Sequence, residues 1–96
     1  MDEKLEIKQE LRRLKPELAE RFHVNSIGLF GSVIRDDFNS KSDIDIIVDF
    51  DEAIGIAFID LADLLEAALK RPVDLVSRRG VKEKYFKEIQ AEIEYV

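Results

Sequence analysis

The chain has 96 residues, of which 46% are hydrophobic, and a formal net charge of −6. This length suits one compact domain with a modest core, so we expect residues 1–96 to form a single domain. The negative charge disfavours direct binding to DNA or RNA, whose phosphates would repel it. The sequence contains no cysteine, which excludes a disulfide framework, a thiolate metal site and thiol catalysis.

The chain start and the apolar runs indicate a cytoplasmic protein. Met1 is followed by charged residues, so the basic-then-apolar pattern of a signal peptide is absent. No apolar run approaches the roughly 20 residues that a membrane-spanning helix needs, and we expect no membrane binding. Because the core of so short a chain is modest, a permanent partner or a homo-oligomer would add useful buried surface.

The N-terminal quarter predicts amphipathic helix. Apolar residues recur there at helical spacing, with charged residues between them. Pro16 falls inside this pattern, and proline is better placed in a first helical turn than in a helix interior. The pattern therefore predicts two helices, over 3–14 and 16–22, with a bend between them. The apolar positions are Leu5, Leu11, Leu14, Leu18 and Phe22.

The middle of the chain predicts two strands separated by a turn and a polar loop. The run Val24–Phe30 is apolar and predicts the first strand. The pair Gly31–Ser32 ends that strand and can begin a short helix that reaches about Asp36. Polar residues then fill 36–42. The run Asp43–Phe50 alternates at first and then becomes continuously apolar, which is typical of a buried strand.

The C-terminal half predicts a helix, a short strand and another helix. Apolar residues at helical spacing predict a helix over 54–70, which Arg71–Pro72 ends. The run Val73–Val76 predicts a short strand, and a further helix begins near Val81. The final residues, 91–96, fit either a helix end or an edge strand.

These elements predict the fold class. Helices alternate with strands along the whole chain, which is typical of an α/β or α+β domain. We expect a small mixed sheet of about three to four strands, flanked by about four to five helices.

Two carboxylates begin the second predicted strand. Asp43 and Asp45 are two residues apart, so their side chains project from the same face. Two such charges repel each other unless a cation lies between them. Mg²⁺ prefers one or two carboxylates together with phosphate oxygens and water. The pair therefore predicts a metal site that a phosphate ligand completes, with two metal ions as in nucleotidyl transfer.

The turn before this strand predicts a phosphate site. A strand that ends at Gly31 and opens onto a helix presents free backbone N–H groups at the positive helix end. Ser32 adds a hydroxyl donor, and Arg35 lies one helical turn later as a fixed cation. We expect these three residues to bind a nucleoside triphosphate. As alternatives, the turn is an ordinary helix cap, and Arg35 pairs with a surface acid.

Asp74 is the candidate for a third carboxylate. It lies in the strand-like apolar run Val73–Val76. If that strand lies beside the one that begins at Asp43, Asp74 reaches the metal pair as a ligand or a general base. The alternative is that Asp74 only caps a turn or pairs with a lysine.

These motifs resemble the glycine–serine and aspartate–x–aspartate signature of the polymerase-β-like nucleotidyltransferases. More closely, the chain is similar to the minimal nucleotidyltransferases, the MntA-type antitoxins encoded beside a helical HEPN-domain toxin of the HepT type. The chain departs from the family pattern after Arg35, where Asp36 stands in place of the usual glycine. The similarity runs through residues 14–18, 28–32, Arg35, 42–45 and 73–76.

The resemblance implies a polymerase-β-like nucleotidyltransferase fold and a set of roles. Asp43, Asp45 and Asp74 would bind Mg²⁺, and the turn Gly31–Ser32 would hold the nucleotide phosphates. It further implies transfer of AMP from ATP to a tyrosine of the HEPN toxin, which silences the toxin.

Two other functions remain open from the sequence. The first is an antitoxin that neutralises its toxin by binding alone, on a fold whose metal site has lost its catalytic role. The second is a transferase that acts on a small molecule such as an aminoglycoside. The first predicts the same fold and complex as the enzyme, so only an activity measurement separates them.

Overall fold

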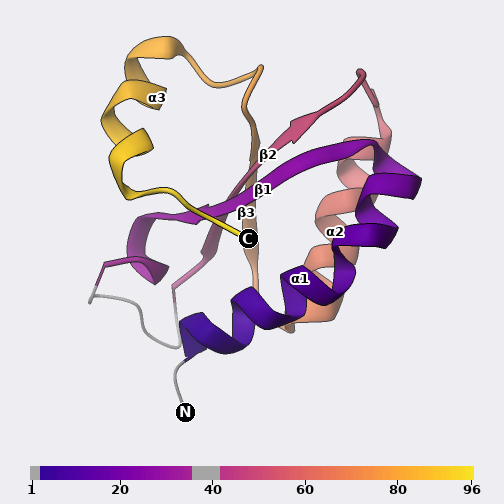
Figure 1. The fold of residues 1–96 in the computed structure, drawn as a ribbon, viewed down its shortest axis with the longest axis horizontal. Helices are drawn as coiled ribbons and strands as arrows, with labels where there is room; N and C mark the ends of the chain where they lie inside the picture. The colour runs from indigo at the N-terminus through magenta and orange to yellow at the C-terminus, as the bar shows by residue number, and fades with distance from the viewer. Residues whose placement is uncertain (1–2, 36–41) are drawn as a thin grey trace.

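The computed structural model describes residues 3–35 and 42–96. A four-stranded sheet in the order β3-β2-β1-β4 lies at its centre, with α1 and α2 on one face and α3 on the other (Figure 1). The helices, with η marking short 3-10 helices, and strands are α1 (Glu3–Phe22), β1 (Val24–Phe30), η1 (Gly31–Val33), β2 (Ile44–Phe50), α2 (Ala57–Leu69), β3 (Val73–Ser77), α3 (Glu83–Ile89), η2 (Gln90–Glu92) and β4 (Glu94–Tyr95).

The sheet is mixed, as expected. β1 pairs antiparallel with β2 on one side and with β4 on the other, whereas β2 and β3 run parallel. Parallel neighbours need a crossover connection, and α2 supplies it between β2 and β3. The adjacency of β2 and β3, on which the role predicted for Asp74 depends, is therefore present.

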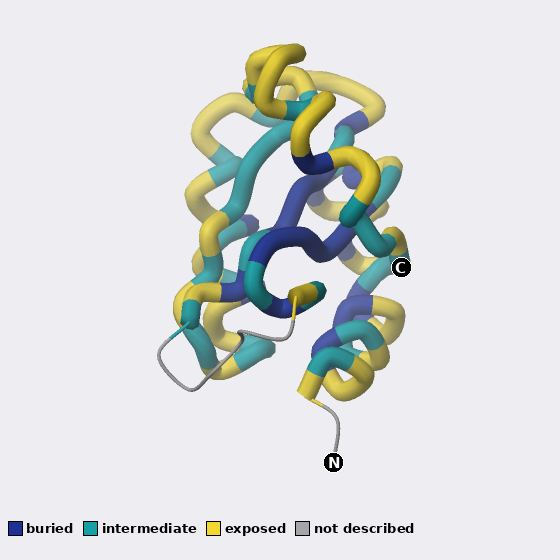
Figure 2. Tube along the Cα trace, turned by 90° about the vertical axis from the view of Figure 1, so that its left-hand side faces the viewer, coloured by how far each residue is buried: buried dark blue, intermediate teal, exposed yellow. Residues whose placement is uncertain are grey.

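The two faces of the sheet differ in how fully they are covered. The main core lies on the α1 and α2 face, where Leu11, Leu18 and Leu61 have no exposed surface. The opposite face carries a smaller cluster, in which Ile89 of α3 packs on Phe30 and Ile47. Figure 2 shows the buried strands, in dark blue, between layers of partly exposed helix. The smaller cluster leaves the part of this face nearest the start of β2 open to polar residues.

The prediction of two N-terminal helices is wrong, because α1 is one helix that contains Pro16. The buried residues Leu14 and Leu18 lie on the same face on either side of the proline, so their burial continues without interruption. Pro16 itself is exposed. Burial of this stripe outweighs the cost of about 3 kcal/mol for a proline inside a helix.

The predicted number of helices is correspondingly too high. The described residues form three α-helices and two 3-10 helices, and the α-helices carry the layers of the fold. The first strand has the predicted bounds, and β2, α2 and α3 begin one to three residues later than expected. The C-terminal segment is an edge strand, since β4 pairs with Gly28 and Leu29 of β1. The polar loop predicted over 36–42 lies almost wholly outside the described residues.

None of the helices among residues 3–35 and 42–96 is both long enough and apolar enough to cross a membrane.

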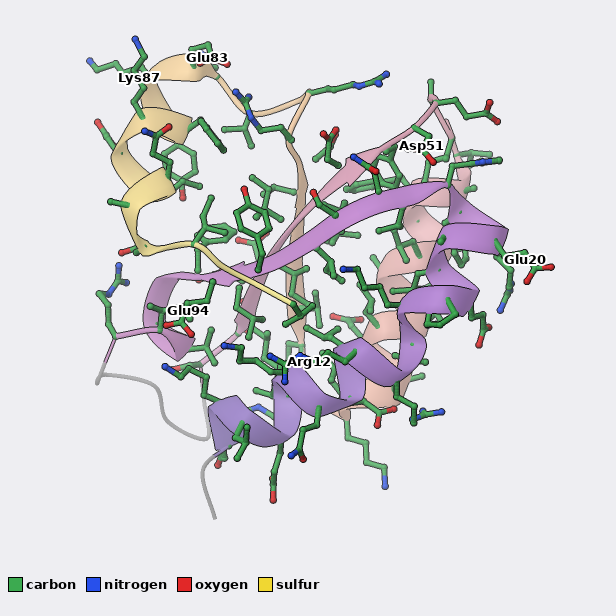
Figure 3. The ribbon with its side chains drawn as sticks, in the orientation of Figure 1. Arg12, Glu20, Asp51, Glu83, Lys87 and Glu94 are labelled. Carbon is green, nitrogen blue, oxygen red and sulfur yellow. The ribbon has the colours of Figure 1, made fainter. Side chains whose placement is uncertain are left out.

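Ion pairs connect the N-terminal helix α1 to the C-terminal strand β4. Lys4 and Lys8 of α1 contact the carboxylate of Glu94 in β4 at 3.2 and 3.0 Å, and Figure 3 shows Glu94 close to the N-terminal half of α1. These pairs hold β4 at the edge of the sheet, beside β1.

Candidate functional site

Asp45 and Asp74 lie side by side on neighbouring strands. In the parallel pairing of β2 and β3, Asp45 is the register partner of Asp74. Side chains alternate along a strand, so Asp45 lies on the same face as Ile47, which packs under α3. Asp43 directly precedes β2 and is exposed. The three carboxylates predicted from the sequence therefore gather on the α3 face, at the end of the sheet that α3 leaves open.

The surroundings of Asp45 raise its pKa to about 6. Burial is the main cause, because it disfavours the charged carboxylate. The negative charges of Asp74 and Asp43 raise the pKa further, as does a hydrogen bond to Asp74, whereas Arg35 lowers it. Burial and the neighbouring like charges thus raise the pKa of Asp45, and a cation bound between these carboxylates would lower it again.

Gly31 forms the turn that packs against Asp45. Its φ of +73° is left-handed, which favours glycine. A Cβ atom at this position would overlap Oδ2 of Asp45, so only glycine lets the turn approach this carboxylate. The preceding residue, Phe30, is the register partner of Asp45 in the β1–β2 pairing. The predicted phosphate-binding turn and the predicted metal site are therefore in direct contact.

Ser32 and Arg35 follow in and after η1. The helix begins at Gly31, so its first backbone N–H groups lie beside the carboxylates. Ser32 is partly buried, and the side chain of Arg35 is 56% exposed. The charge of Arg35 acts on Asp45, which shows that the guanidinium lies near this end of the sheet. All six residues predicted for the site lie in this region.

Glu92, at the end of η2, is a site residue that the sequence did not reveal. Gly31 donates its backbone N–H to Oε1 of Glu92 at 3.1 Å, and Nη1 of Arg35 lies 3.6 Å from the same oxygen. In the sequence Glu92 is one acid among several, between Glu88 and Glu94, and no spacing pattern distinguishes it. Only the return of the chain along β1 brings it to the turn.

Hydrogen bonds connect the backbone at the start of β2 to the turn that precedes β3. Arg71 donates from Nη2 to the backbone carbonyl of Ser42 at 2.8 Å, and Ile44 donates its backbone N–H to the carbonyl of Pro72 at 3.0 Å. These bonds fix the backbone on both sides of Asp43. Arg71 also pairs with Glu3 at 3.0 Å, so it ties the start of α1 to the start of β2.

The donor set fits a hard divalent cation. The described part of the chain holds no group of three acidic or histidine side chains close enough together to bind a metal ion on their own. Mg²⁺ in nucleotide sites needs only one or two carboxylates, because phosphate oxygens and water complete its coordination. The adjacent carboxylates of Asp45 and Asp74, whose repulsion raises the pKa of Asp45, are suited to such a shared site.

Comparisons with known proteins identify the family of the chain. Residues 11–95 match the family model described as a nucleotidyltransferase domain. The chain is 44% identical over 92 residues to a protein adenylyltransferase MntA from Thermococcus cleftensis, covering 95% of this chain and 93% of the relative.

Solved structures of toxin–antitoxin complexes are also similar. One, a toxin–antitoxin with AMP-PNP, matches with a TM-score of 0.76 and 28% identity, over 92% of this chain and 70% of that chain. Another, a tri-AMPylated HEPN toxin from Shewanella oneidensis in complex with its MNT antitoxin, matches with a TM-score of 0.71 and 25% identity, over 96% and 70% of the two chains. The chain belongs to the nucleotidyltransferase domain family and, within it, to the minimal nucleotidyltransferases of the MntA type.

Proposed function

We propose that this protein transfers AMP from ATP to a tyrosine hydroxyl of a HEPN-type toxin and thereby acts as its antitoxin. One observation carries the proposal: Asp45, which pairs with Asp74 on the neighbouring strand, packs directly against a glycine turn that opens a short 3-10 helix. The similarity to an MntA protein adenylyltransferase and to a HEPN toxin that carries AMP groups supports the donor and the acceptor.

The nucleotide and the metal ions would occupy the open end of the α3 face. The backbone N–H groups of η1 that follow Gly31, whose own N–H is bound to Glu92, would bind the phosphates together with the hydroxyl of Ser32 and the guanidinium of Arg35. Asp43, Asp45 and Asp74 would hold Mg²⁺, with two ions as the expected number. Bound magnesium would neutralise the triphosphate and lower the pKa of the attacking hydroxyl.

The reaction is an in-line displacement at the α-phosphorus of ATP. The tyrosine oxygen forms a bond to this phosphorus, and the bond to the bridging oxygen of the β-phosphate breaks, so pyrophosphate leaves. The hydroxyl proton passes to a base, for which Asp74 is our candidate because it lies beside Asp45 at the open end of the sheet. The requirement for ATP and the absence of cysteine favour the cytoplasm as the site of the reaction.

Labelled ATP tests this function. The purified chain is incubated with Mg²⁺, α-labelled ATP and the HEPN protein encoded beside it. We expect label on the partner, loss of at least about 100-fold in rate for Asp43→Asn and for Asp45→Asn, and no label without Mg²⁺. Asp63→Asn is the matched control, since Asp63 is an exposed acid of α2 and lies outside the site. Its rate should equal that of the unchanged protein.

The same preparation separates catalysis from masking. If no label reaches the partner, and the complex forms equally well with Asp45→Asn, the protein acts by binding alone and the proposed transfer is wrong. If label appears at the same rate in Asp45→Asn as in the unchanged protein, transfer is real but the carboxylate assignment is wrong. Mapping the labelled residue of the partner identifies the acceptor hydroxyl.

A further inference from the structure

Glu92 is placed beside the turn by the packing of the C-terminal segment. It ends η2, and its neighbours Ile89 and Ile93 pack on the cluster of Phe30 on the α3 face. Gly28 permits this approach, because a Cβ atom at residue 28 would lie 2.7 Å from Cγ2 of Ile93. The side chain of Glu92 is 28% exposed. Its carboxylate is therefore held near β1 by apolar packing on both sides of it in the sequence.

The hydrogen bond to Gly31 continues the sheet beyond the end of β4. Val96 donates to the carbonyl of Ile27, so the backbone of Ile27 faces β4. In an antiparallel pair, the backbone N–H and carbonyl groups of alternate residues face the same neighbouring strand. Ile27 and Leu29 face β4, so Gly31, two residues farther along, faces the same side. β4 begins at Glu94, opposite Leu29, so the backbone pairing of β1 with β4 ends there. Oε1 of Glu92 accepts the Gly31 N–H beyond this point.

Oε1 of Glu92 also faces the guanidinium of Arg35. Nη1 of Arg35 lies 3.6 Å from Oε1 of Glu92, while the Gly31 nitrogen lies 3.1 Å from it. One carboxylate thus contacts both parts of the predicted phosphate site, the turn and the guanidinium. On the other side of the turn Gly31 packs against Asp45, so movement of the turn would also change the distance between the phosphates and the metal ligands.

We propose that Glu92 is a positioning residue for the nucleotide: it fixes the Gly31–Ser32 turn and directs Arg35 towards the triphosphate. The inference rests on the proposed function, because it assumes that this turn binds nucleotide. Glu92 acts through Gly31 and Arg35 and not on the reacting atoms. Its loss should therefore weaken nucleotide binding and raise KM, while kcat at saturating nucleotide changes little.

Binding of AMP-PNP with Mg²⁺, followed by calorimetry, tests this role. We expect Glu92→Ala to raise Kd about tenfold, because one charge-assisted hydrogen bond and one ion pair are lost. Glu92→Gln keeps an oxygen for the Gly31 N–H but loses the charge that faces Arg35, so its Kd should rise only about threefold. Glu88→Ala is the matched control, an exposed acid of the preceding helix, and should leave Kd unchanged.

Two further measurements separate positioning from a general loss of structure. In an NMR spectrum the amide proton of Gly31, one of four glycines, should shift upfield in Glu92→Ala and less in Glu92→Gln, while the Gly55 signal stays in place. In an Arg35→Ala background, Glu92→Gln should cause a smaller further rise in Kd, because the Glu92 charge has lost one of the two groups on which it acts.

The outcomes are distinct. A Kd in Glu92→Ala that equals or falls below that of the unchanged protein overturns the positioning role, and a lower value would mean that the carboxylate competes with phosphate. An equal loss in Glu92→Gln within the Arg35→Ala background also contradicts it. If Glu92→Ala fails to fold, the positioning role is tested by the Kd of Glu92→Gln, measured alone and in the Arg35→Ala background. Failure of the unchanged protein to bind AMP-PNP overturns the proposed function itself, whatever the Glu92 variants do.

Discussion

Asp45 links the stability of the protein to the chemistry of its site. Its pKa in the folded protein is about 6, compared with an ordinary value of 3.8, mainly because of burial and the charges of Asp74 and Asp43. The folded state therefore binds this proton more tightly than the unfolded state does. The contribution of Asp45 to stability is greatest below about pH 4, declines as pH rises to about 6, and stays low above that.

Replacement of the Asp45 carboxyl group tests the direction of this pH dependence of stability. We expect Asp45→Asn to be more stable than the unchanged protein at pH 7.5 by about 1–2 kcal/mol, which allows for partial exposure of the side chain to water. The difference should shrink towards zero as pH falls from 6 to 4. Urea unfolding of both proteins at pH 4.5, 5.5 and 7.5 measures it. A difference that does not change with pH would contradict the raised pKa.

Gly31 and Gly55 form a natural pair for testing the turn. Both have positive φ, +73° and +57°, so alanine adds similar backbone strain at each. Only at residue 31 would the new Cβ overlap Asp45, since nothing lies within 4 Å of the corresponding position at Gly55.

We therefore expect Gly55→Ala to cost about 1–2 kcal/mol of unfolding free energy and to leave activity intact. Gly31→Ala should cost more, and AMP transfer should fall at least about 100-fold because the turn moves away from the carboxylates. Thermal unfolding and the labelled-ATP assay give the two quantities. Equal effects of the two substitutions on stability and activity would show that the Gly31–Asp45 contact has no special role.

At the scale of elements, α1 shows that packing decides where a helix ends. A proline has no N–H, so Pro16 cannot donate to the carbonyl of residue 12, and its ring disfavours a straight helix. The helix nevertheless runs from Glu3 to Phe22, because buried residues before and after the proline lie on one face. Near the start of the same helix, Lys4 and Lys8 form ion pairs with Glu94 of β4.

Pro16→Ala should therefore stabilise the protein, by about 1–3 kcal/mol, because it restores a helical hydrogen bond and raises helix propensity at an exposed position. Pro72→Ala is the comparison, since Pro72 precedes β3 and lies outside any helix. It should give no such gain. Thermal unfolding of both variants measures the change. A loss of stability in Pro16→Ala would mean that the helix relies on a proline-specific bend.

Across the whole molecule, one face of the sheet carries the larger hydrophobic core, and the other carries the candidate site. Hydrophobic residues of α1 and α2 form the larger core on one face, whereas α3 contributes to a smaller cluster on the other. Figure 3 shows Glu83 and Lys87 of α3 directed away from the sheet, so this helix contributes its apolar side to the fold and leaves its charges outside. The carboxylates and the turn occupy the uncovered end, where a nucleotide and an acceptor hydroxyl can both arrive.

Local features of the sequence were sufficient for much of this picture. Alternation and apolar runs predicted β1, β2 and β3, because such patterns reflect burial on one or both faces of a sheet. The spacing of Asp43 and Asp45, and the glycine–serine turn before them, predicted the two halves of the site. Each of these inferences depends on residues that are close together in the chain, where strand and turn geometry fix the distances.

Only the tertiary structure decided the rest. The pairing of Asp45 with Asp74 depends on the order of strands in the sheet, and the contact of Glu92 with Gly31 joins residues 61 positions apart. The continuity of α1 across Pro16 depends on what its apolar face packs against. Secondary-structure patterns carry no information on such contacts, because burial and pairing between distant segments are set by the free energy of the whole fold.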